Sequence, residues 1–404
     1  MTSDEQNKLV FWLDGIFKKD GFSDLHYDFP NYDTTGGYSA NVIFVSIKAH
    51  KNNKKKEFEI FVKESRDKDI ILNDDQLKLV YSTEINFYSK VVPYYKKFAL
   101  ERNTSPFNNI PHCFGTISDN NKYILFLENL KPKGFKINDL ERLIDLDQAK
   151  LVLQAYGRWH AFSLACKDQE PEMFKHYYEL MSPSKAESMC ELFICSMLKE
   201  IEVAIDLFRE KNCLEIMKRL EFLKEEYPKM FRDCFFNKNE DFLVVRHADC
   251  WNNNFLFHYD DQSRADQAIL IDWQISFIGS PLADVTQFLL YSCHKETLEK
   301  IDDLLRFYYQ SLSEKLLELG SNPKKCLPWN TCQKSFKKYV QLAVGGVPLN
   351  IRFRHKTDPD EQNLAQHVND GSFNVWCGNE IRNSEEYFET MKEILELCIE
   401  RNFM

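Results

Sequence analysis

The sequence predicts an α+β fold of two lobes, with a small β-rich amino-terminal lobe and a larger, mainly helical carboxy-terminal lobe. Three observations predict it. The chain has 404 residues, more than one hydrophobic core usually serves. Its first 130 residues read mainly as strands, whereas the later pattern is mostly that of amphipathic helices. We therefore expect lobes at 1–130 and 131–404, with a ligand-binding cleft between them.

Composition excludes several classes of protein. Hydrophobic residues make up 44% of the chain and charged residues 28%, which is typical of an ordinary folded protein. The net charge of -10 argues against general binding to nucleic acid or to anionic membranes. The amino terminus has no secretory signal pattern, and no apolar run of about 18 residues occurs. Twelve cysteines without a CxxC pair indicate reduced thiols. We expect a cytoplasmic monomer.

The amino-terminal lobe begins with an expected antiparallel hairpin. The β-rich runs at 40–49 and 57–65 are joined by the lysine-rich turn "KNNKKK". Just before the first run, "DTTGGYSAN" contains Gly36 and Gly37, which let a backbone approach a ligand closely. This segment could be an ordinary turn or a loop that covers phosphates.

A helix is expected at 75–92, because apolar residues recur there on one helical stripe. Glu84 falls on that stripe, where a buried carboxylate requires a cation. Lys63 lies on the second strand of the hairpin, on the face opposite Val62, and is the candidate partner. The alternative is that Glu84 lies in water at the edge of the stripe.

The rest of the chain reads as one more strand and then helices. "KYILFLENLKPKGF" (122–135) is an apolar strand that runs into a connector containing proline and glycine. Amphipathic patterns then predict helices at 145–167, 187–211, 296–319 and 384–400.

Two strand-like segments in the helical lobe carry polar residues at their ends. "FLVVRHADCWNNNFLF" contains Asp249 and Asn254, and "QAILIDWQISFIG" contains Asp272. If the segments pair, the three side chains converge. This set suits phosphoryl transfer from a magnesium nucleotide, because Mg²⁺ prefers a few oxygen ligands together with phosphates. Asp272 and Asn254 would hold the metal, and Asp249 would accept the proton of the acceptor hydroxyl.

This set of polar residues supports functional roles for the candidates that precede it in the chain. Lys63 would contact the phosphates, Glu84 would fix Lys63, and the backbone of 36–40 would cover the phosphates. Each feature alone is weak evidence for such a site; the Asp-x4-Asn spacing, for example, recurs by chance in many proteins. The order in which the features follow one another along the chain is the specific evidence.

At this point the chain resembles a known family. "HADCWNNNFLF" resembles the catalytic loop of the aminoglycoside phosphotransferase and choline kinase group. "LIDWQISFIGSPLADVTQFLLYS" is most similar to the segment that follows it in the insect ecdysteroid kinase-like family. "TEINFYSKVVP", "LENLKPKGF" and "RWHAFS" also resemble that family, so the resemblance spans about residues 30–310.

The resemblance implies a protein-kinase-like fold with ATP in the cleft, Mg²⁺ as cofactor and a small-molecule alcohol as acceptor. It implies that Asp249 is the catalytic base, that Asn254 and Asp272 are magnesium ligands, and that Lys63 pairs with Glu84. Nucleotide contacts would come from a loop with Gly36, Gly37, Tyr38 and Ser39 and from a hinge of Glu128, Asn129 and Leu130. The chain departs from the family pattern at Ala248, Trp273 and Asn129, without loss of a catalytic group.

The neighbours of these residues are expected to have structural roles. His247 holds the loop, Asp284 caps or tethers it from below, and Cys250 and Trp251 anchor it to the core. Asn252 and Asn253 are expected in the loop and on the surface, and His160 is expected to be a packed helix residue.

The preferred function is therefore an ATP-dependent kinase that acts on a hydroxyl of a small, largely apolar molecule, such as an ecdysteroid or a xenobiotic alcohol. A protein kinase is disfavoured, because only eleven residues separate Asp272 from Asp284, too few for an activation segment that docks a peptide. The remaining alternative is a catalytically silent ligand-binding protein of the same fold. We expect the acceptor pocket between segments near 185–215 and 290–350.

Overall fold

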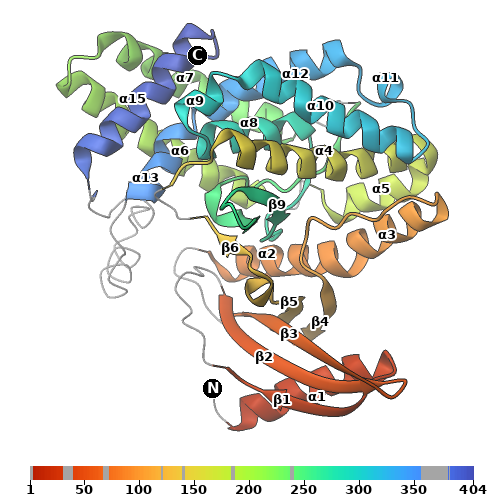
Figure 1. Cartoon of the computed structure of the whole chain (residues 1–404). Helices are drawn as coiled ribbons and strands as arrows, with labels where there is room; N and C mark the ends of the chain where they lie inside the picture. The colour runs from red at the N-terminus through yellow and green to blue at the C-terminus, as the bar shows by residue number, and fades with distance from the viewer. Residues whose placement is uncertain are drawn as a thin grey trace.

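The computed structural model describes residues 3–30, 40–66, 72–119, 122–138, 142–182, 187–236, 241–355, 381 and 383–404. A sheet and helix α1 (Ser3–Lys19) form one end of the molecule, and layers of helices form the other (Figure 1). This arrangement confirms the predicted α+β fold with a strand-rich amino-terminal part. The placing of a lobe boundary at residue 130 stays a prediction. Four predicted nucleotide contacts lie outside the described residues: Gly36, Gly37, Tyr38 and Ser39.

The sheet has five antiparallel strands in the order β1-β2-β3-β5-β4. Their bounds are Ser23–Asp28, Ala40–Lys51, Lys54–Ser65, Lys122–Glu128 and Cys113–Asp119 in that spatial order. β2 and β3 form the predicted hairpin, paired from Ala40 with Ser65 to Lys51 with Lys54. The two residues at its tip, Asn52 and Asn53, have φ of 51° and 58°, as a tight two-residue turn requires.

The two faces of the sheet have different partners. Val62 and Phe126 are paired across β3 and β5, and both pack against α1 through residues such as Leu13. Successive side chains of a strand point to opposite faces. Lys63 and its cross-strand partner Leu125 therefore face the helical layers. Helix α1, which was not expected from the sequence, covers the far face with Leu9, Leu13 and Phe17.

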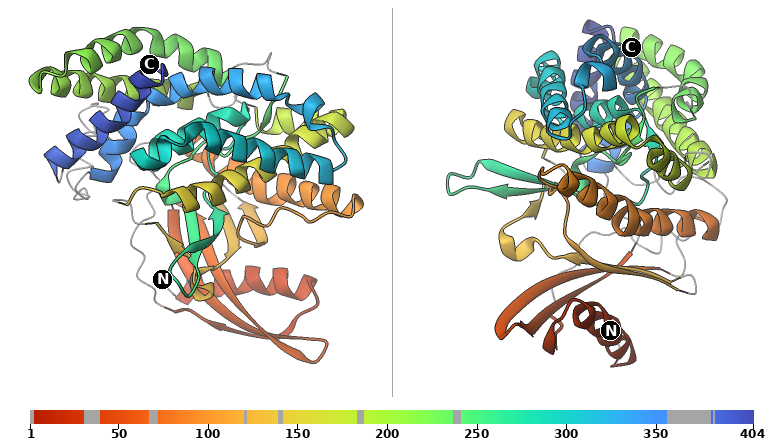
Figure 2. Two further views of the ribbon diagram at one scale, coloured as in Figure 1. Left: turned by 45° about the horizontal axis from the view of Figure 1, so that its top comes forward. Right: turned by 90° about the vertical axis from the view of Figure 1, so that its right-hand side faces the viewer.

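The predicted helix at 75–92 is present but continues further. α2 (Asp74–Asn86) begins at a capping box formed by Asn73 and Gln76. A π-helical turn (Phe87–Val91) joins it to α3 (Val92–Glu101). Both helices lie between the sheet and the remaining helices, as Figure 1 and the right-hand view of Figure 2 show. α2 can therefore contribute to both parts of the molecule.

The helical part contains all the helices expected from the sequence and several that were not identified. Its helices are α4 (Leu146–Gln169), α5 (Pro171–Leu180), α6 (Glu187–Glu210), α7 (Leu214–Phe235), α8 (Pro281–Ser292), α9 (Lys295–Leu298), α10 (Ile301–Glu318), α11 (Pro323–Cys326), α12 (Trp329–Val344), α13 (Val347–His355) and α15 (Ser384–Glu400). α8 is buried at nearly every position, because α4, α12 and α13 pack around it. Its apolar residues belong to the largest hydrophobic cluster among the described residues.

Two small sheets bring together the segments that were expected to pair. β7 (Val244–Val245) pairs with β10 (Ile278–Gly279), and β8 (Phe255–Tyr259) pairs with β9 (Ala265–Leu270). β6 (Lys136–Ile137) extends the second sheet. The loop 246–254 thus runs from β7 to β8, and the loop 271–277 runs from β9 back to β10. Because both loops join the same two strand pairs, they lie side by side.

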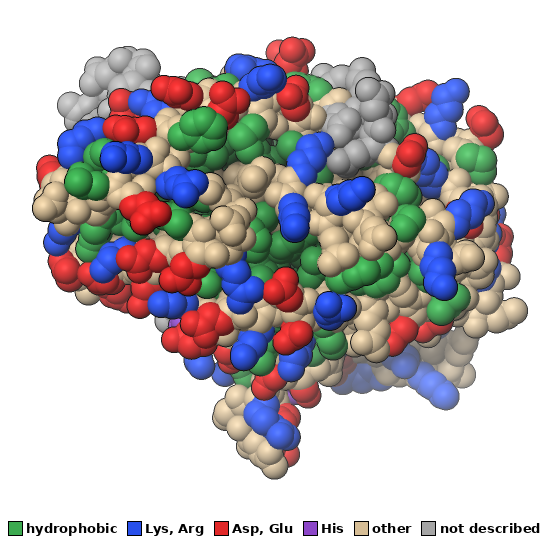
Figure 3. All heavy atoms as spheres, turned by 90° about the horizontal axis from the view of Figure 1, so that it is seen from above, with side chains coloured by type: hydrophobic (Ala, Val, Ile, Leu, Met, Phe, Trp, Pro, Cys, Tyr) green, Lys and Arg blue, Asp and Glu red, His purple; other side chains and the backbone are tan. Residues whose placement is uncertain are grey.

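The surface and the cysteines can be described for the same features that the composition suggested. Viewed from the helical end, basic and acidic side chains are interspersed with apolar ones (Figure 3). Every cysteine in the described ranges carries a free thiol. Among the described helices, none has the length and apolar character needed to cross a membrane.

Candidate active site

Asp249 and Asn254 contact each other directly within the first loop. The Asn254 amide nitrogen Nδ2 donates to Asp249 Oδ2 at 2.7 Å and to the Asp249 carbonyl at 2.9 Å. The backbone N–H of Ile271 donates to the Asn254 carbonyl at 3.0 Å, which ties the first loop to the second. Asp272 is the next residue along the chain. The three polar residues selected from the sequence are therefore brought to one place.

Lys63 connects the sheet to this place. Its Nζ lies 2.8 Å from Glu84 Oε2 and 2.7 Å from Asp272 Oδ1. Glu84 is 1% exposed and Lys63 is also buried, so the solvent-edge alternative for Glu84 is wrong. Burial alone would lower the pKa of Lys63, but the carboxylates of Asp272 and Glu84 raise it. Lys63 thus remains a cation held between two carboxylates.

Asp249 has the properties of a base that can titrate near neutral pH. Burial and the nearby charge of Asp272 raise the pKa of its carboxyl to about 7, against the opposing hydrogen bond from Asn254. A carboxylate with a pKa in this range accepts a proton more readily than an ordinary aspartate.

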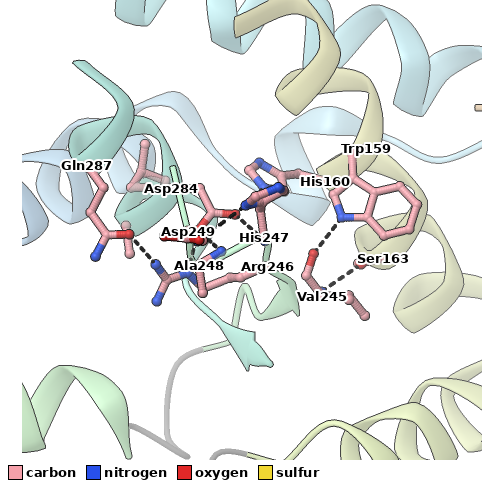
Figure 4. A network of polar contacts seen from close by, with 12 residues as sticks. Trp159, His160, Ser163, Val245, Arg246, His247, Ala248, Asp249, Asp284 and Gln287 are labelled. Atoms are coloured by element: carbon pink, nitrogen blue, oxygen red, sulfur yellow. Dashed lines mark hydrogen bonds and ion pairs between the residues drawn. The ribbon is translucent and has the colours of Figure 1, made fainter. Parts of the chain in front are cut away.

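The buried carboxylate of Asp284 holds the first loop from below, as expected. Its oxygens accept hydrogen bonds from the backbone N–H groups of His247 at 2.7 Å and of Ala248 at 3.2 Å. Arg246 Nε donates to the same carboxylate at 2.7 Å, and His160 Nε2 lies 3.3 Å from it (Figure 4). One side chain on α8 therefore fixes three successive residues of the loop.

The negative charge of the buried Asp284 carboxylate is balanced by the positive charge of Arg246. Burial would raise the pKa of this carboxyl, but the Arg246 guanidinium and the hydrogen bond with His160 lower it well below its ordinary value. Arg246 also donates to Gln287 at 3.0 Å. No role was expected for Arg246 from the sequence, although an arginine directly after a buried apolar strand requires a nearby carboxylate.

His247 joins the two loops in one tautomer. The backbone N–H of Asp249 donates to His247 Nδ1 at 3.2 Å, so Nδ1 carries no proton. Nε2 then carries the proton and donates to the Ile271 carbonyl at 2.8 Å. Burial lowers the pKa of the imidazole, which favours this neutral form. The contacts fit the expected loop-holding role.

Both loops contain a residue with left-handed backbone. Ala248 has φ of 67° and Asp272 has φ of 64°. This conformation is unfavourable for residues with a side chain and persists where the surroundings impose it. The hydrogen bonds to Asp284 impose it at Ala248.

Aromatic packing fixes the residue that follows Asp272. Trp273 is fully buried and stacks on Phe87 of the π-helical turn, with ring centroids 4.1 Å apart. It also contacts Trp159, whose indole N–H donates to the Val245 carbonyl at 2.7 Å. Trp273 thus links α4, the second loop and the helix that carries Glu84.

The predicted hinge lies at the end of β5. The Asn129 backbone N–H donates to the Glu59 carbonyl at 2.8 Å, and its side-chain Oδ1 accepts from Lys131 at 3.1 Å. The Asn129 side-chain nitrogen is buried and lacks a hydrogen-bond partner among the described residues. Glu128 forms an ion pair with Lys133 at 2.5 Å, and the backbone carbonyl of Leu130 accepts from Lys133.

The donor set fits a magnesium ion that is shared with phosphates. The described residues contain no group of three His, Cys, Asp or Glu side chains able to hold a metal alone. Because Asn254 Nδ2 is engaged by Asp249, the oxygen of that amide is the atom left for a metal. Asp272 offers its second carboxylate oxygen. Mg²⁺ commonly takes one or two protein ligands and completes its shell with phosphate and water oxygens.

Two details of the first loop differ from or extend the expectations. Asn252 is 1% exposed and donates to the Arg142 carbonyl at 2.9 Å, so its expected surface position is wrong. The same carbonyl accepts from Asn138 Nδ2 at 2.7 Å, and local sequence does not reveal this contact between the loop and the connector before α4. Trp251 is half-buried and packs on Phe353, at a centroid distance of 5.7 Å.

The chain is similar to one known family and to a solved structure. A family model described as the ecdysteroid kinase-like family matches residues 35–321. A solved structure of a mutant aminoglycoside 2'-phosphotransferase-IIIa in complex with GDP is similar at 11% sequence identity and a TM-score of 0.40, over 98% of this chain and 98% of that chain. No curated protein matches.

Proposed function

Because the chain belongs to the ecdysteroid kinase-like family, a family of small-molecule kinases, we propose that it transfers the γ-phosphoryl group of ATP to a hydroxyl of a small, largely apolar alcohol. An ecdysteroid or a xenobiotic alcohol is the proposed acceptor class. The observation that carries the proposal is the contact of Lys63 with both Glu84 and Asp272, beside the Asp249–Asn254 pair.

Each residue has a proposed task in the reaction. Glu84 orients Lys63, whose ammonium contacts the phosphates, and the backbone of Glu128–Leu130 meets adenine. Asn254 and Asp272 hold Mg²⁺, which when bound neutralises charge on the phosphates. Asp249 accepts the hydroxyl proton while the acceptor oxygen bonds to the γ-phosphorus. The bond from that phosphorus to the bridging oxygen breaks, and ADP leaves.

The segment after Asp272 supports a small acceptor. The chain passes from Asp272 through 274–277 into β10, and α8 begins at Pro281. This connection is anchored at Ile278, whose N–H donates to the Met181 carbonyl at 2.9 Å. A peptide acceptor requires a longer segment on which to dock.

Mass spectrometry of products tests the proposal. The full chain is incubated with magnesium, ATP and a panel of steroid and phenolic alcohols, and at least one alcohol is expected to gain a phosphoryl group. Asp249→Ala abolishes the product, whereas Asp303→Ala, at an exposed position on α10, leaves it unchanged. If ATP binds but no alcohol of the panel is phosphorylated, the result favours the catalytically silent alternative.

A further inference from the structure

Half-buried and buried side chains alternate along the loop that carries the proposed base. Asp249, Trp251 and Asn253 are half-buried, whereas Cys250 and Asn252 are buried. The half-buried side chains therefore share the side of the loop that has access to solvent, and the buried ones share the side that faces the core. Trp251 thus presents its indole on the same side as the carboxylate of Asp249.

Backbone hydrogen bonds hold Trp251 close to Asp249. The Trp251 N–H donates to the Asp249 carbonyl at 3.1 Å, which closes a three-residue turn centred on Cys250. The Trp251 carbonyl accepts from the N–H of Asn254 at 3.0 Å. Two residues of chain span at most about 7 Å, and a turn shortens that distance. The indole therefore starts within the length of a small molecule from the proposed base.

The N–H edge of the indole lies beside the Asp249 carboxylate. This N–H is the only hydrogen-bonding group of a tryptophan side chain. Burial and the charge of Asp272 raise the pKa of Asp249, and hydrogen bonds from the side chains of Asn254 and Trp251 oppose that increase. The position of the ring agrees with the one that the backbone of the loop gives it.

Phe353 of α13 limits the orientation of the indole. The centroids of the two rings are 5.7 Å apart and their planes are inclined by 42°, a geometry in which aromatic pairs attract each other. Trp251 remains half-buried in this contact. Part of its ring is therefore held by α13, and part is left as an apolar surface next to Asp249.

An alcohol that gives its proton to Asp249 places its oxygen about 2.6–3.2 Å from that carboxylate. The carbon atoms next to the hydroxyl then lie beside the indole. We propose that Trp251 is a specificity-determining residue, on whose ring the body of the acceptor packs, and that it selects an alcohol with a rigid apolar ring next to the hydroxyl. The inference rests on the proposed function of Asp249.

Binding of naphthylmethanol, an uncharged alcohol with a rigid ring, tests the proposal without turnover. The full chain is titrated calorimetrically in the presence of magnesium and a non-hydrolysable ATP analogue. Trp251→Ala should weaken binding about tenfold, because the aromatic contact and its apolar area are lost. Trp251→Phe keeps a ring and should weaken binding less than about threefold. n-Pentanol has no ring, so its affinity should change less than about threefold in Trp251→Ala.

Trp329→Ala is the matched control. Trp329 on α12 is also half-buried and packs on an aromatic partner, Tyr309, at a centroid distance of 5.0 Å. Its replacement should leave the affinity for naphthylmethanol unchanged. The affinity for the ATP analogue is measured for each variant and should stay the same, because a Trp251 that only supported the loop would also displace Asn254 when removed.

Four results would overturn the proposal. They are the absence of saturable binding of naphthylmethanol to the wild type, binding that Trp251→Ala leaves unchanged, equal losses for the two alcohols, and an equal loss of affinity for the ATP analogue. Trp251→Leu replaces Trp251→Ala if circular dichroism shows that the latter is misfolded. Binding that depends on Trp251 without phosphorylation of any alcohol would support this site and contradict only the proposed catalysis.

Discussion

Replacement of Lys63 by methionine should destabilise the protein far more than replacement of its partner Glu84 by glutamine. In the wild type one cation lies between two carboxylates, at 2.8 Å from Glu84 and 2.7 Å from Asp272. Lys63→Met leaves the buried Glu84 facing Asp272 without a cation. Removal of one partner from a buried ion pair costs about 3–5 kcal/mol.

Glu84→Gln has a smaller expected effect. Lys63 keeps Asp272 as its counter-ion, and the glutamine carbonyl still accepts a hydrogen bond from the ammonium. The loss is that of one charge-assisted hydrogen bond, about 1–2 kcal/mol. Urea denaturation followed by circular dichroism gives both free energies of unfolding, and the expected difference between the variants is about 1–4 kcal/mol.

The pH dependence provides the sharper measurement. Burial holds the pKa of Glu84 above its ordinary value of 4.5 even though Lys63 lowers it, so removal of Lys63 raises the folded-state pKa of that carboxyl further. When the pKa of a carboxyl is higher in the folded than in the unfolded state, the folded form binds a proton first as pH falls. The free energy of unfolding of Lys63→Met therefore rises as pH falls through the folded-state pKa of Glu84. Below neutral pH, Lys63→Met should approach the wild type by up to about 1.4 kcal/mol per pH unit. The reasoning about the shared cation is wrong if Lys63→Met is as stable as Glu84→Gln at pH 7. It is also wrong if the difference in free energy of unfolding between Lys63→Met and the wild type does not change with pH.

Three further predictions concern the first loop. Asp249→Asn should slow phosphoryl transfer about 10²–10⁴-fold in single-turnover assays while affinity for an ATP analogue stays the same, and an unchanged rate would exclude Asp249 as the base. Ala248→Gly should raise the free energy of unfolding in urea by about 0.5–1 kcal/mol, because glycine adopts φ of 67° without strain; a loss of stability would contradict this. Asp284→Asn should lower stability at pH 7. Because the folded-state pKa of Asp284 lies below 3.8, its contribution is present above that value and is lost as pH falls. The deficit of Asp284→Asn should therefore shrink by about 1.4 kcal/mol per unit below pH 4, whereas Asp303→Asn shows no such change.

Features with local sequence signals were predicted well. Strand alternation placed Lys63 opposite Val62, and helical periodicity placed Glu84 on the buried stripe, which together predicted an ion pair that the structure contains. The expected pairing of the two strand-like segments brings Asp249 and Asn254 to one place with Asp272, as was expected from the sequence. These patterns depend on geometry that repeats every two or every 3.6 residues.

Features that depend on distant contacts were missed. Arg246 and the burial of Asn252 involve partners on α8 and in the connector before α4, for which no spacing rule exists. Helix α1 has an apolar stripe, but nothing in its sequence indicates which face of the sheet it covers. The phosphate-covering loop at Gly36–Ser39 and the hinge role of Asn129 stay predictions.

The hydrogen bonds of Asp284 also bear on the order in which the protein forms during synthesis. Asp284 follows His247 by 37 residues, and Asp272 follows Lys63 by 209. A ribosome delivers the chain from the amino terminus. The strand that carries Lys63 therefore emerges long before Asp272, and the loop with Asp249 emerges before the helix that orders it. A nascent chain that ends before α8 lacks the contacts that order the first loop, so translation must pass residue 284 before the candidate site can form.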